Sequence, residues 1–78
     1  MGIRAIVFEF EPIDGQDEPC RSVSDICEWQ DTDRLDLAKQ RLRRSLKLRR
    51  IGALEVLFIK IDENRNELFN LHSAIWNI

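Results

Sequence analysis

The sequence predicts a single small α+β domain with the element order β-β-α-β-β, in which one amphipathic helix packs on an antiparallel sheet. Three observations predict this fold: a mid-chain segment with apolar residues at helical spacing, alternating apolar segments on both sides of it, and turn-forming residues between them. The 78 residues suffice for one domain, so residues 1–78 are expected to fold as one unit.

A helix over about residues 33–50 is the clearest element of the sequence. Its apolar residues recur at three- and four-residue spacing and form one stripe that can pack on a sheet. The stripe consists of Leu35, Ala38, Leu42 and Leu46. Thr32 is expected to cap the first turn, where the acids Asp33 and Asp36 favour the positive end of the helix. Gly52 stands where a glycine would let the chain turn off the helix.

Two strands are predicted before the helix. The side chains of residues 3–11 alternate between the two faces expected of a strand. Ala5 and Val7 lie on the face opposite to a second apolar set, so the start of this strand is apolar on both faces and fits an interior position in the sheet. That second set is Ile6, Phe8 and Phe10. Residues 12–19 contain two prolines and an Asp-Gly pair and predict a turn. Residues 20–30 fit a strand that forms a hairpin with the first, or a helix, and the strand is preferred.

Two further strands are predicted after the helix. Residues 53–62 are apolar on both faces, which indicates a central strand, and a polar turn follows them. Residues 68–78 fit a strand or a helix, and the strand is preferred because a short polar link usually closes a hairpin. This strand would face the core with Phe69, Leu71, Ser73 and Ile75. Trp76 would then lie on the opposite face, where an exposed tryptophan would mark a dimer interface through the sheet.

The charge of the chain is unevenly distributed, although its net value is only −2. Residues 1–36 contain ten acids and three bases, whereas residues 37–52 contain seven bases and no acid. Three interpretations remain open: solvated bases that complement the helix dipole, contact with an acidic protein surface, and contact with nucleic acid. The dipole needs only a few bases, at about 0.3–1 kcal/mol each. The acidic isoelectric point of 5.3 argues against nucleic acid.

The preferred interpretation is a small protein-binding module that docks on a larger partner with an acidic surface, and occludes or bridges it. The expected contact surface combines arginines with two leucines that lie off the core stripe, and it includes an exposed tryptophan. Its residues are Leu37, Arg41, Arg44, Lys47, Leu48 and Trp76. The alternatives are a nucleic-acid-binding protein that uses the same helix and a structural subunit of a larger assembly. A homodimer is a further expectation.

The sequence contains no spacing typical of a catalytic, cofactor-binding or metal-binding motif, which predicts a protein without enzymatic activity. His72 is the single histidine, and Cys20 and Cys27 are spaced as in no zinc site. No apolar run approaches the roughly 18 residues of a membrane span. Acids interrupt the apolar N-terminal segment, unlike in a signal peptide. We therefore expect a cytoplasmic protein with reduced cysteines.

Overall fold

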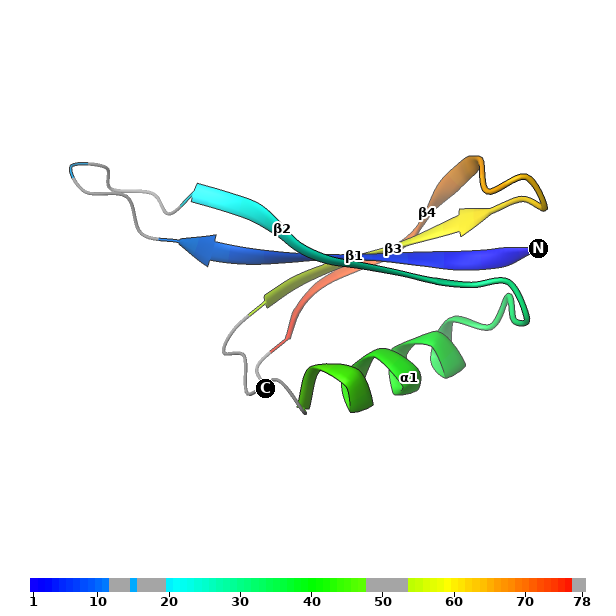
Figure 1. The fold of residues 1–78 in the computed structure, drawn as a ribbon, viewed down its shortest axis with the longest axis horizontal. Helices are drawn as coiled ribbons and strands as arrows, with labels where there is room; N and C mark the ends of the chain where they lie inside the picture. The colour runs from blue at the N-terminus through cyan, green and yellow to red at the C-terminus, as the bar shows by residue number, and fades with distance from the viewer. Residues whose placement is uncertain (12–14, 16–19, 48–53, 77–78) are drawn as a thin grey trace.

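The computed structural model describes residues 1–11, 15, 20–47 and 54–76, and it forms one sheet and one helix (Figure 1). The elements are β1 (Gly2–Glu11), β2 (Cys20–Trp29), α1 (Leu35–Lys47), β3 (Leu54–Ile61) and β4 (Glu67–Trp76). The predicted α+β fold with the order β-β-α-β-β is confirmed. The two ambiguous segments, 20–30 and 68–78, both contain strands.

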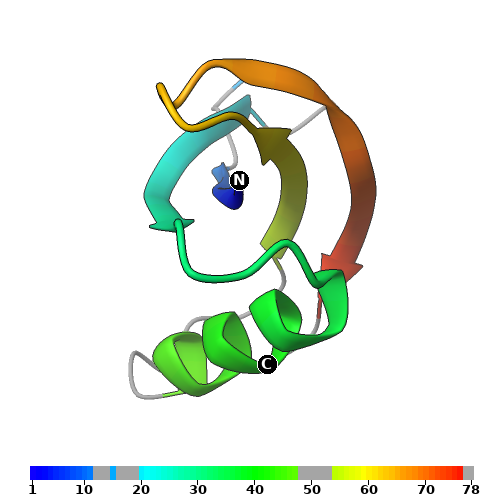
Figure 2. The same cartoon turned by 90° about the vertical axis from the view of Figure 1, so that its right-hand side faces the viewer.

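The sheet has the strand order β2-β1-β3-β4, and all neighbouring strands are antiparallel. β1 and β3 lie in the interior of the sheet, as their apolar residues on both faces predicted. Because β2 and β3 both run antiparallel to β1, they are parallel to each other and need a crossover connection. The helix α1 supplies that connection and packs on one face of the sheet, as Figure 2 shows along the strands.

The helix begins at Leu35, two residues later than predicted, because the chain before it is held by a separate turn. The Thr32 hydroxyl oxygen accepts a hydrogen bond from the backbone N–H of Arg34 at 3.1 Å. The backbone N–H of Ala38 then donates to the carbonyl oxygen of Arg34 at 3.2 Å. Lys47 is the last described residue of the helix; its predicted continuation to residue 50, the glycine stop and the 12–19 turn, except for position 15, lie outside the described residues.

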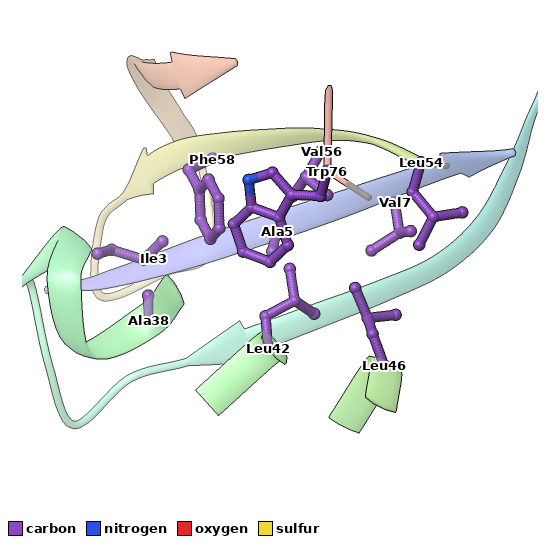
Figure 3. Packing of buried hydrophobic residues seen from close by; sticks show 10 residues of the cluster. All are labelled: Ile3, Ala5, Val7, Ala38, Leu42, Leu46, Leu54, Val56, Phe58 and Trp76. Atoms are coloured by element: carbon purple, nitrogen blue, oxygen red, sulfur yellow. The ribbon is translucent and has the colours of Figure 1, made fainter. Parts of the chain in front are cut away.

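The hydrophobic core lies between α1 and the face of the sheet that the helix covers (Figure 3). From the predicted helical stripe, Ala38, Leu42 and Leu46 are fully buried, and Leu35 packs against the core from a half-buried position. The sheet contributes alternate residues of β1 and β3 and the end of β4. These are Ile3, Ala5, Val7, Leu54, Val56, Phe58 and Trp76.

The predicted core face of β4 is wrong, because β4 carries two extra residues relative to β3. Phe58 pairs with His72 whereas Ile59 pairs with Asn70, so Leu71 is one of these bulged residues. A bulge reverses which side chains face the core beyond it. Leu71 packs against the core as predicted, whereas Ser73 and Ile75, beyond this bulge, lie on the face without the helix and are exposed. Phe69 pairs with Lys60 and lies on the helix side, but it is exposed too.

Candidate interaction surfaces

Of the helix residues predicted to bind a partner, Arg44 is exposed, whereas Leu37 and Arg41 are half-buried. The Lys47 side chain and all of Leu48 lie outside the described part of the chain. The structure therefore places Arg44 at the surface as expected, with Leu37 and Arg41 on a flank that neighbouring chain partly covers.

Arg41 is engaged by the connection between β2 and α1. Its two terminal nitrogens donate to the two carboxylate oxygens of Asp31, both at 2.8 Å. The hydrogen bond from Arg41 lowers the pKa of Asp31, which keeps that carboxylate charged. A bidentate pair of this kind uses the planar guanidinium fully. The positive charge of Arg41 is thus neutralised within the chain.

The expected exposure of Trp76 is wrong, because the bulge at Leu71 turns this side chain to the core face of the sheet. Its exposed fraction is 8%, and its ring centroid lies 5.7 Å from that of Phe58. The guanidinium carbon of Arg43 lies 4.9 Å from the Trp76 ring centroid, a cation–π geometry. Figure 3 shows the indole between Phe58 and the helix. Trp76 is a core residue and does not belong to an exposed contact surface.

Three bases of α1 form no ion pair with any described acid. We call Lys39, Arg43 and Arg44 the cationic helix surface. Arg43 and Arg44 are exposed and Lys39 is half-buried. The remaining arginine near the start of the helix, Arg34, is bound to Asp36 at 2.7 Å, so its charge is balanced.

The opposite face of the sheet, which α1 does not cover, is also rich in apolar residues. We call it the open face. Cross-strand partners share a face of the sheet, and Ile6 pairs with Ile26 on one side and Leu57 on the other. Phe8 likewise pairs with Val23. The apolar half of the open face comprises Ile6, Phe8, Phe10, Val23, Ile26, Leu57 and Ile75.

The other half of the open face is closed by an ion-pair network. Arg4 donates to Glu28 at 2.7 Å and to Glu67 at 2.9 Å, and Arg65 donates to Glu28 at 2.7 Å. Since these side chains come from β2, β1, β4 and the β3–β4 turn, the network crosses over β3. Beneath it, Ile59 and Ile61 of β3 are buried although they lie on the face without a helix.

The turn between β3 and β4 positions Arg65 for this network. One carboxylate oxygen of Asp62 accepts hydrogen bonds from the backbone N–H groups of Asn64 and Asn66, both at 2.8 Å. Arg65 adopts a left-handed backbone conformation with φ of 67°, and its carbonyl oxygen accepts a bond from Arg4 at 2.9 Å. The polar turn predicted from the sequence thus contributes the side chain and the carbonyl oxygen of Arg65 to the ion-pair network.

We expect the stability of the domain to fall at acid pH partly because of Glu28. The hydrogen bond from Arg65 lowers the pKa of Glu28 from its ordinary value of 4.5, and the bond from Arg4 lowers it further. The unfolded chain therefore binds the proton first, so this stabilisation is complete above about pH 5 and is lost as the pH falls through the lowered pKa. Urea unfolding between about pH 7 and pH 3 measures this, and a Glu28→Gln chain with an unchanged acid slope would contradict it.

The exposed members of the apolar half were missed as candidate binding residues. Ile75 was predicted to face the core, and Val23 and Ile26 lie in the segment that was ambiguous. The sequence did contain a signal for this open apolar surface, because it predicts two strands that are apolar on both faces and only one helix to cover them. A helix of 13 residues is about 20 Å long and covers one face at most.

Among the described residues, no three histidine, cysteine or acidic side chains are grouped so that they could hold a metal ion. Cys27 is half-buried in β2, and His72 is half-buried in β4. No helix in the described part of the chain is long and apolar enough to cross a membrane. Comparisons with protein-family models, curated proteins and solved structures gave no match.

Proposed function

We propose that this chain is a small, non-enzymatic protein-binding module of the cytoplasm that docks its cationic helix surface on an acidic surface of a larger protein. The observation that supports this most is the charge distribution on α1. Arg34 and Arg41 are neutralised by neighbouring acids, whereas Lys39, Arg43 and Arg44 have no acidic partner among the described residues. Carboxylates on an acidic partner would form ion pairs with these three bases.

The packing of the helix supports the same surface. Ala38, Leu42 and Leu46 anchor α1 to the sheet, so the helix presents its basic side without rearrangement. Arg43 is further oriented by the Trp76 ring beneath it. Binding then costs less conformational entropy than it would for a freely rotating arginine.

A protein partner is preferred over nucleic acid because of the charge of the whole domain. The chain contains 14 acids and 12 bases, so the domain outside the helix has a net negative charge that would repel the phosphates of a duplex. A folded protein partner whose acidic region is confined to the docking patch would not be repelled by the acids outside the helix.

We expect Arg44→Glu to weaken partner binding at least tenfold, because it places like charges against each other in the contact. The measurement is affinity capture from cell extract with the full chain as bait, followed by titration of each captured protein. Arg34→Glu is the matched control: it makes the same charge change immediately before the helix, at a base already paired with Asp36.

Proteins that bind the original chain and Arg34→Glu, but not Arg44→Glu, would support the proposal. Equal recovery with all three chains would overturn it. A parallel salt titration against a DNA duplex tests the rival partner, since phosphate contacts weaken steeply as salt rises. Duplex binding that Arg44→Glu abolishes would replace the protein partner by nucleic acid.

A further inference from the structure

We propose that the apolar half of the open face is the interface of a homodimer, in which two chains pack sheet on sheet around a two-fold axis. This surface lies on the opposite side of the sheet from α1, so the proposal is independent of docking through the cationic helix surface. It would place the two helices on the outside of a four-layered α/β/β/α particle.

The exposure of the apolar half supports an interface. Val23, Ile26 and Ile75 are more than half exposed, at 57%, 56% and 64%, and they come from both edge strands of the sheet. Between them, Ile6 and Leu57 are half-buried at the centre of the same face. Aliphatic side chains gathered across four strands resemble one side of a β-sandwich core.

The charges of the open face favour a second copy of this chain over an acidic or basic partner. The ion-pair network at its other end contains two arginines and two glutamates that satisfy each other, so it presents no net charge. Within the apolar half, the described cross-strand pairs place two charged residues of opposite sign, Glu55 opposite Phe8 and Arg21 opposite Phe10. A two-fold axis sets a surface against itself, which a nearly neutral apolar surface tolerates and a charged one does not.

The size of the apolar half fits a weak dimer. Four strands spaced about 4.8 Å apart, with about four residues of each strand rising about 3.3 Å each, give a flat extent of about 250 Å². Side-chain relief increases the accessible area above this value, but the area stays below the roughly 800 Å² per partner of a standard interface, so the dimer is expected to dissociate readily. The face of the sheet that α1 covers already has its core, whereas Val23, Ile26 and Ile75 of the apolar half stay exposed among the described residues.

The edges of the sheet are poorly suited to the alternative of edge-to-edge association. β4 has two register irregularities against β3, and β2 has one against β1, between Val7 and Phe8. Bulges on edge strands twist the backbone and interrupt the row of hydrogen-bonding groups that another strand would need. The open face is therefore the better route to self-association.

Sedimentation equilibrium of the full chain tests the proposal. We expect a particle of twice the 9.2 kDa chain mass that dissociates on dilution. Ile26→Glu should raise the dissociation constant at least tenfold, because a charge would be buried at the interface. Ile75→Glu repeats the test from the other edge strand, and circular dichroism verifies that each variant is folded.

Phe69→Glu is the matched control. Phe69 is as exposed as Ile26, at 57%, but it pairs with Lys60 and so lies on the helix side of the sheet. The proposal predicts that this variant dimerises like the original chain. A monomer at every concentration would overturn it, and so would a dimer that survives both open-face substitutions or that Phe69→Glu weakens equally.

Discussion

Trp76→Ala is expected to lower the free energy of unfolding by about 3–5 kcal/mol, the usual effect of removing a large buried aromatic side chain. A domain of this length has a total stability of about 0.05–0.15 kcal/mol per residue, so the loss would approach the whole stability of the fold. The indole is 8% exposed, packs against the Phe58 ring in a tilted arrangement and lies under Arg43, and its removal would leave a cavity between the sheet and α1.

Urea unfolding followed by circular dichroism measures this effect without depending on tryptophan fluorescence. Phe69→Ala is the comparison, because it also removes an aromatic ring from β4 but at a position that is 57% exposed. We expect its effect to be far smaller than that of Trp76→Ala. Similar losses for the two variants would show that Trp76 is not part of the core.

Glu28→Gln is expected to lower the free energy of unfolding at neutral pH by about 1–3 kcal/mol, as for the loss of hydrogen bonds to a charged group that is largely shielded from water. Glu28 accepts bonds from both Arg4 and Arg65, and its side chain is only 16% exposed. An amide retains one acceptor oxygen but no charge, so two guanidinium groups lose their shared counter-ion. The layer that buries Ile59 and Ile61 should loosen as a result.

The comparison for this prediction is Asp36→Asn, which neutralises an acid of a surface ion pair. Asp36 and Arg34 are 63% and 69% exposed, and pairs of this kind contribute little to stability. Hydrogen exchange provides a second measurement, because the amides of β3 near Ile59 should lose protection in Glu28→Gln alone. Equal stability of Glu28→Gln and the original chain would mean that the network does not hold this end of the sheet.

The element types were predictable from local patterns. Apolar residues at helical spacing identified α1 and, in Ala38, Leu42 and Leu46, its buried side. Apolar residues on both faces of residues 3–11 and 53–62 identified the two interior strands, because an interior strand is flanked by protein on both edges and packed on its faces. These features depend on neighbours within one element, which the sequence records directly.

The face of β4 was not predictable in the same way. A strict period of two assigns Ile75 to the core and Trp76 to the surface, and the structure reverses both. The reversal comes from the residue inserted opposite β3 at Leu71. A bulge is a property of two paired strands, so no pattern within β4 alone reports it.

The candidate contact residues also divide into those that a local pattern places and those whose environment depends on contacts between distant parts of the chain. Arg44 could be placed on the outer side of α1 from helical geometry, and it is exposed. The pairing of Arg41 with Asp31 could not, because that acid lies ten positions earlier and meets the helix only through the turn that precedes it.

By itself, the sequence determined the element order, the buried stripe of the helix and the concentration of bases on α1, since each follows from the periodicity of a continuous segment. Tertiary structure alone decided which bases keep an unbalanced charge, which face of β4 is buried, and that an apolar surface remains open on the sheet. Those outcomes depend on distances between residues far apart in the chain, and such distances are set only when the strands pair and the helix crosses over them.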